Sequence, residues 1–144
     1  MFDFLFPSKN KQLVKKWIKE HRKIVSLANA IIEAYKKGDL KKAKKRLNQL
    51  NNLTIEHLMQ EDLSFYKLKK NSNKLEVETI EKITEFTDTF GGTKVTLMNF
   101  ISKYAKPNVE LDKEFINTFK ILAGILVERI QFEESNLYQA LIKE

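Results

Sequence analysis

Cysteine is absent from the sequence, and glycine, proline and histidine are scarce, with four, two and two residues among 144. Without cysteine the chain forms no disulfide and has no thiol chemistry, which fits a reducing compartment. The sequence also lacks a glycine-rich phosphate loop, a nucleophilic-serine motif, a signal peptide and any apolar run long enough to span a bilayer. We therefore expect one soluble, cytoplasmic domain over residues 1–144, without membrane association or enzymatic activity.

Positive charge is in excess, with a formal net charge of +7, and the lysines gather at residues 36–46 and again at 67–74. Such clusters attract phosphates. Few aromatic or glycine residues interleave with these lysines, however, so nucleic-acid bases would find little to stack on. We interpret both clusters as solvated surface, and we expect a protein partner rather than a specific nucleic acid.

Apolar residues recur every three or four positions through four long segments, which is the spacing of helices that bury one face. The segments cover about residues 9–37, 40–70, 75–105 and 111–143. Turn signals separate them at Asn71 and Pro107, and Gly38 is placed to close the first helix where Asp39 caps the second. Because short connections join antiparallel neighbours, the sequence predicts an all-α fold, an up-down-up-down antiparallel four-helix bundle.

Five ionisable residues fall on the inward faces of these helices, and we call them the polar layer. They are His21, His57, Glu61, Arg129 and Glu133. Their depths along the antiparallel helices differ by only about one turn, so their side chains should converge. From the third helix, the residues expected at the same depth are Ile80, Ile83, Thr84 and Thr87, with Glu81 and Glu85 facing outward.

The polar layer permits three arrangements. In a metal-free network, Arg129 pairs with Glu133 and Glu61 while the two imidazoles complete the hydrogen bonds. In a reduced metal site, the two histidines and two glutamates bind one divalent metal, provided that Arg129 swings outward. A third arrangement rebuilds the site with Glu81 or Glu85. The sequence leaves open whether iron, another divalent metal or no metal is bound.

The spacing within the polar layer resembles a known family. His57-Leu58-Met59-Gln60-Glu61 is a His-x-x-x-Glu pair, and the segment from Arg129 closes with the pair Glu133-Glu134. With His21, this pattern resembles the hemerythrin-like cation-binding domains over nearly the whole chain. The resemblance implies a four-helix bundle that holds a di-iron centre with about five histidines and two carboxylates. It places four residues at ligand positions, namely His21, His57, Glu61 and Glu133.

The chain departs from that pattern at two points. The family usually has a histidine where this sequence has Arg129, and the histidine of the third helix is missing. A permanently charged guanidinium beside a cationic cluster is electrostatically unfavourable. The resemblance therefore implies a hemerythrin-like bundle with a depleted metal site, acting as a non-enzymatic binding or sensing module. An iron- or oxygen-binding domain with non-standard ligands is an alternative.

A second resemblance rests on Leu13-Val14-Lys15-Lys16-Trp17 and on the segment from Arg129 to Glu134. These segments look like the regulator of sigma D family, bacterial helical-bundle proteins that bind the primary sigma factor. In that family an arginine in the fourth helix is the expected residue. The resemblance implies a protein-interaction regulator of transcription as a further alternative.

Overall fold

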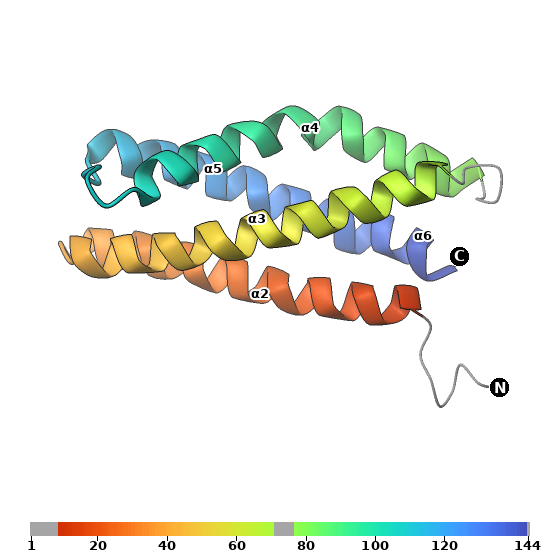
Figure 1. Cartoon of the computed structure of the whole chain (residues 1–144), viewed down its shortest axis with the longest axis horizontal. Coiled ribbons are helices and arrows are strands. Elements are labelled where there is room, and N and C mark those ends of the chain that lie inside the picture. Colours follow the sequence, from red (N-terminus) through yellow and green to blue (C-terminus); the bar gives the residue numbers. More distant parts are fainter. Residues whose placement is uncertain (1–8, 71–76, 144) are drawn as a thin grey trace.

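The computed structural model describes residues 9–70 and 77–143, which form a bundle of long helices. The elements are α2 (Lys9–Lys36), α3 (Leu40–Lys70), α4 (Val77–Ala105), α5 (Lys113–Phe132), the π-helical turn η2 (Glu133–Leu137) and α6 (Tyr138–Lys143). Neighbouring helices alternate in direction, and α5, η2 and α6 follow one another along the fourth side (Figure 1). The predicted all-α four-helix bundle is confirmed, while the turn expected at Asn71 lies outside the described residues. Among the described helices, none is both long and apolar enough to cross a membrane.

The α2–α3 turn follows the local signals in the sequence. Gly38 has a φ of 77°, which is the left-handed conformation that glycine adopts without steric cost. The backbone N–H of Gly38 donates to the carbonyl of Tyr35, and that of Asp39 donates to the carbonyl of Ala34. This pair of bonds is a Schellman motif. The Asp39 carboxylate then accepts from the backbone N–H of Lys42 at 3.1 Å, so Asp39 caps α3 as predicted.

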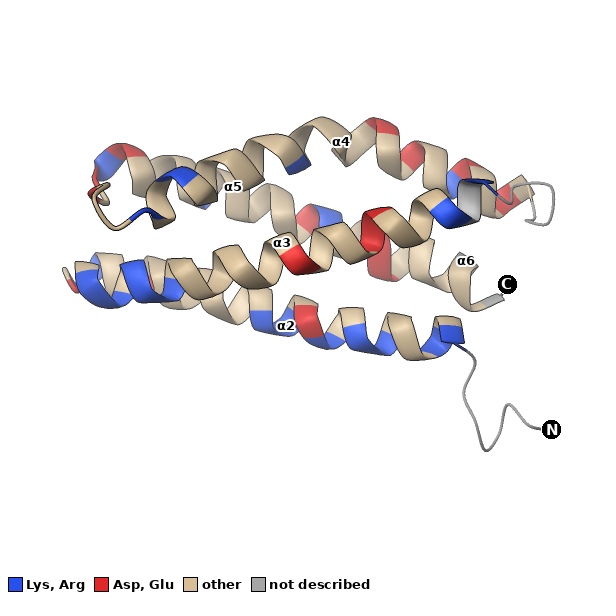
Figure 2. Cartoon of the chain, viewed as in Figure 1, with Lys and Arg blue, Asp and Glu red and all other residues tan. Residues whose placement is uncertain are grey.

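Lysine and arginine residues cluster where α2 ends and α3 begins, at the left-hand end of the bundle (Figure 2). One of them, Lys44, has a structural role. Its Nζ donates to the main-chain carbonyls of Tyr104, Lys106 and Val109. These carbonyls belong to the end of α4 and the connection to α5, so Lys44 ties α3 to the α4–α5 connection.

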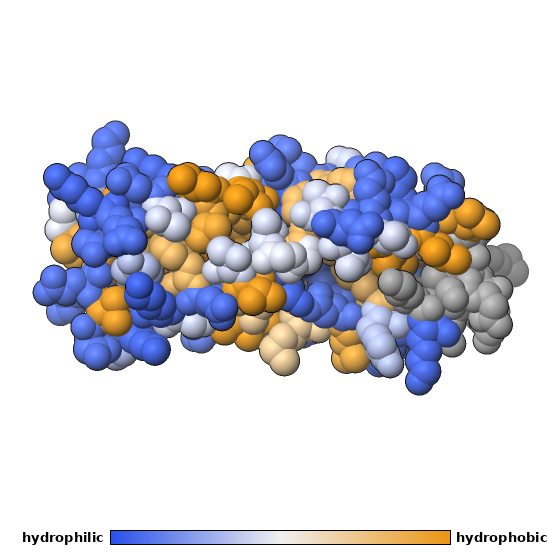
Figure 3. All heavy atoms as spheres, turned by 90° about the horizontal axis from the view of Figure 1, so that it is seen from above, coloured by the Kyte–Doolittle hydropathy of each residue, from blue (hydrophilic) through white to orange (hydrophobic). Residues whose placement is uncertain are grey.

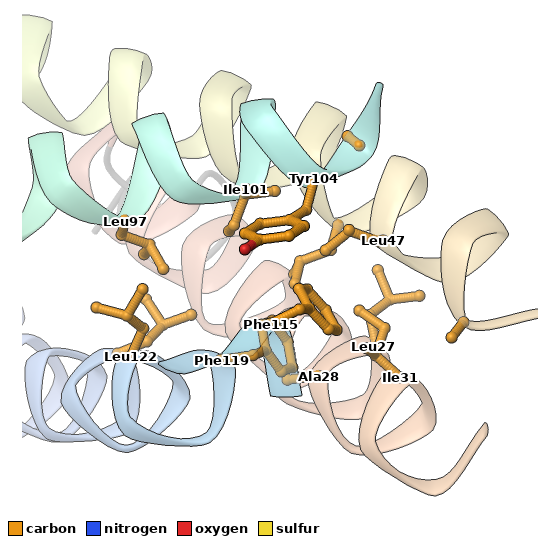
Figure 4. Close-up of a cluster of buried hydrophobic side chains, with 14 of the residues drawn as sticks. Leu27, Ala28, Ile31, Leu47, Leu97, Ile101, Tyr104, Phe115, Phe119 and Leu122 are labelled. Atoms are coloured by element: carbon orange, nitrogen blue, oxygen red, sulfur yellow. The ribbon is translucent and has the colours of Figure 1, made fainter. Parts of the chain in front are cut away.

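The apolar core consists of two clusters. The larger packs around Tyr104, Phe115 and Phe119 (Figure 4) and extends to the end of the bundle that holds the α2–α3 turn. The smaller contains Trp17 and Phe65 and lies toward the other end. Along α2, α3 and the α5–η2 segment, the residues of the polar layer fall between members of the two clusters. The polar layer therefore separates two hydrophobic units.

On the face seen in Figure 3, hydrophilic side chains cover the left-hand end, and hydrophobic patches interrupt them along the bundle. The exposed large apolar residues include Met59, Leu63 and Tyr66, which follow one another along α3.

Two expectations about the helices need correction. The last helix is not continuous, because a π-helical turn at Glu133–Leu137 interrupts it. On α4, Thr84 and Thr87 are exposed rather than inward, and their hydroxyls donate to the carbonyls of Ile80 and Ile83. Such a local bond satisfies the hydroxyl on the helix surface. Phe86 is buried in their place. Glu81 and Glu85 face solvent as expected.

Candidate metal centre

The structure buries all five residues of the polar layer. Their exposed fractions run from 0% for Glu61 to 4% for Arg129. His21 comes from α2, His57 and Glu61 from α3, and Arg129 and Glu133 from the α5–η2 segment. One ligand atom from each of the two histidines and two glutamates lies within 4.8 Å of the others. Three sides of the bundle thus deliver nitrogen and oxygen atoms to one point.

Carboxylates outside the layer hold both imidazoles. Nδ1 of His21 lies 3.0 Å from Oε2 of Glu134, and Nδ1 of His57 lies 2.9 Å from Oε1 of Glu20. A carboxylate accepts, so each Nδ1 carries the proton and donates it. The two Nε2 atoms then face each other at 3.0 Å. A carboxylate that fixes the tautomer of an imidazole in this way is the usual support of a metal-binding histidine.

The centre of the layer has more acceptors than protons. The Tyr138 hydroxyl lies 2.8 Å from Glu133 Oε2, 3.0 Å from Glu61 Oε2 and 3.2 Å from His21 Nε2. Its single proton satisfies only one of these three acceptors at a time. The other oxygen of Glu61, Oε1, lies against Nε2 of His57 in an ion pair. A cation or additional protons must balance these atoms.

Arg129 is paired within the layer but does not bridge it. Its Nε donates to Oε1 of Glu133 at 3.1 Å, and its guanidinium stacks 4.8 Å from the centre of the Phe86 ring. Its Nη2 is buried without a hydrogen-bond partner among the described residues. The expected pair with Glu133 is present. The expected bond from Arg129 to Glu61 is not present between these two described residues, and Oε2 of Glu61 lies 3.0 Å from the Tyr138 hydroxyl.

The environment shifts the two histidines in opposite directions. Burial, and then the proximity of His57, lowers the pKa of His21. Burial alone would also lower the pKa of His57, but the hydrogen bond and charge of Glu61, followed by those of Glu20, raise the pKa overall. His57 is therefore the histidine of the pair that takes up a proton more readily. A proton and a metal ion compete for the same nitrogen.

The Tyr138 hydroxyl also lies at the polar layer, although the helical spacing of the sequence did not predict it there. Tyr138 is fully buried, and it follows Glu133 by five positions. In a regular α-helix, residues five apart point about 140° away from each other. The π turn changes this relation, since the backbone N–H of Tyr138 donates to the carbonyl of Glu133. Both side chains then face the same point. Glu20, beside the predicted His21, was also missed.

Comparison with known proteins agrees with this geometry. The model of the hemerythrin HHE cation-binding domain matches residues 12–141, which is nearly the whole chain. The matched segment contains every residue of the polar layer together with Tyr138. No curated protein and no solved structure gives a match. The chain therefore belongs to the hemerythrin HHE cation-binding domain family.

Proposed function

We propose that this protein is a metal-responsive binding module whose polar layer holds one divalent cation. The ligands are His21, His57, Glu61 and Glu133. The observation that carries the proposal is the surplus of acceptors at the centre of the layer, between two imidazoles that carboxylates already orient. A divalent cation supplies the positive charge that these atoms need.

The size and the donor types of the cluster support a single ion. A cation about 2.0–2.2 Å from each ligand requires ligand atoms within about 4.4 Å of one another, close to the 4.8 Å of this cluster. Imidazole and carboxylate together suit first-row divalent metals such as iron and zinc. The chain has only two histidines, so it lacks the nitrogen ligands that a di-iron centre of the usual composition needs.

The burial of the ligands favours binding over catalysis. None of the four ligand side chains is more than 2% exposed, so a substrate would have no direct approach to the ion. The ligands come from α2, α3 and η2, which an ion joins to one another. A bound cation would therefore be sensed as a change in the stability of the bundle rather than as turnover.

Metal content tests this function. Protein purified with a chelator is reconstituted with ferrous iron without oxygen, or with zinc, and analysed for metal. We expect about one ion per chain in the wild type and far less than one in His57→Ala and Glu61→Gln. Glu85→Gln is the matched control, because Glu85 is an exposed glutamate of α4, and it should retain the full content.

Thermal unfolding provides a second readout. A cation at about one hundred times its dissociation constant stabilises the fold by about 2.7 kcal/mol. The wild type and Glu85→Gln should gain this stability, and Glu61→Gln should not. The proposal is wrong if the wild type binds no metal after reconstitution, or if Glu61→Gln binds as much as the wild type.

A further inference from the structure

A cavity of about 300 Å³ opens between α3 and α4, beside the polar layer. Aromatic rings form much of its wall, among them Phe65, Tyr66 and Phe86. Arg129 also lines it and is the most deeply buried charged group there. The cavity thus combines an apolar wall with one buried cation. Ligand sites of proteins typically have this composition, and this volume lies at the small end of their range.

Arg129 has donors that the fold does not use. Of its five N–H groups, the Nε–H is spent on Glu133, while Nη2 is buried without a partner among the described residues. A buried donor without an acceptor is unfavourable, and proteins rarely leave one so. The stacking of the guanidinium on Phe86 keeps it in place at the cavity wall.

The other charged groups of the cavity do not oppose an anion. Asp62 and Lys94 both line it, and they form an ion pair with each other. Their charges cancel, so among the lining residues the positive charge of Arg129 remains, and Glu133, which is not part of the lining, pairs with it through Nε. A planar group with two oxygens matches the N–H groups of a guanidinium better than a single oxygen does.

We propose that this cavity binds an aromatic monocarboxylate. The carboxylate pairs with the guanidinium of Arg129 at the cavity wall, and the ring lies among Phe65, Tyr66 and Phe86. The volume of about 300 Å³ accommodates a ligand with a single ring. This inference does not depend on the proposed cation, because the cavity and the free donors belong to the metal-free protein.

Benzoate and its neutral analogue benzamide separate the two parts of the proposal. Each is titrated into the full-length, chelator-treated protein by calorimetry, so that binding to a metal ion does not contribute. We expect benzoate to bind about ten- to a hundredfold more tightly than benzamide, because hydrogen bonds to a charged partner are the stronger ones. Arg129→Gln should abolish that preference.

Two glycine variants keep the test independent of whether Arg129→Gln folds. Gly91 lines the cavity, whereas its neighbour Gly92 does not. A Cβ added at either glycine meets nothing within 4 Å, so the backbone at both positions accepts a side chain. Gly91→Leu should fill the cavity and weaken benzoate at least about tenfold, and Gly92→Leu should bind as the wild type does. Equal affinities for benzoate and benzamide, or undiminished binding by a folded Gly91→Leu protein, would overturn the proposal.

Discussion

Removing the Tyr138 hydroxyl tests how the buried carboxylates of the polar layer are stabilised. In Tyr138→Phe the ring keeps its place, but Glu133 and Glu61 lose the donor that lies 2.8 and 3.0 Å from their oxygens. Both carboxylates are buried, so water does not replace that donor. A hydrogen bond to a charged group contributes about 1.5–3 kcal/mol. We expect the metal-free variant to be destabilised by this amount.

A bound cation should change that result. When a divalent ion neutralises the carboxylates, the hydroxyl of Tyr138 no longer carries the only proton between them. The loss should then approach that of a neutral hydrogen bond, about 0.5–1.5 kcal/mol. The same substitution is therefore more damaging without metal than with it. A smaller loss of stability with metal than without it would show that the ion and the Tyr138 hydroxyl interact with the same carboxylates.

Urea unfolding with and without chelator measures both values. A change of about 2 kcal/mol shifts the midpoint by about 1 M at the slopes typical of small proteins. Tyr104→Phe is the matched control, since Tyr104 is also a buried tyrosine and lies in the larger apolar cluster, away from the polar layer. The reasoning fails if metal-free Tyr138→Phe loses less than about 0.5 kcal/mol, or no more than Tyr104→Phe.

Three further outcomes follow from features outside the ligand set. Burial raises the pKa of Tyr138 above its ordinary value of 10.0, so above that pH the unfolded chain releases a proton that the folded chain keeps. By about pH 11 the wild type should therefore lose about 1.4 kcal/mol more than Tyr138→Phe, measured as the pH dependence of the urea midpoint. Lys44→Met should cost about 1–3 kcal/mol in thermal unfolding because three carbonyls lose their donor, whereas exposed Lys45→Met should change little. Gly92→Ala should stabilise the helix interior by about 0.5–1 kcal/mol, while Gly38→Ala should destabilise by about 1–2 kcal/mol because its φ is 77°. Calorimetry that ranks these two glycine variants in the opposite order would contradict the last expectation.

The buried faces of the helices could be predicted because apolar residues recur at a regular helical spacing. His57 and Glu61 are four residues apart, so an α-helix places them on one side wherever its ends lie. His21 interrupts an apolar stripe of α2, and such an interruption marks a buried polar group that needs a partner. The depth of each residue then followed from helix length alone, because short turns leave little freedom in how neighbours align.

The remaining parts of the site depend on information that the period does not contain. A π turn adds a residue to one turn, so the inward side of everything after Glu133 cannot be read by extending the α-helical pattern. The burial of Phe86 in place of Thr84 and Thr87 depends on a small rotation of α4 about its axis. The direction of the Arg129 side chain depends on its stacking on Phe86. In each case the packing of the helices against one another decides which of several helix faces of similar polarity is buried.

The distances along the chain within the polar layer have a kinetic consequence. His21 and His57 are 36 positions apart, and Tyr138 is 77 positions from Glu61 and 117 from His21. Contacts between residues so distant in sequence cost loop-closure entropy before they return any stabilisation, and they therefore form late in folding. Interactions that are absent from the transition state slow unfolding rather than speed folding. We therefore expect the polar layer to contribute to the lifetime of the folded bundle more than to the speed with which the bundle forms.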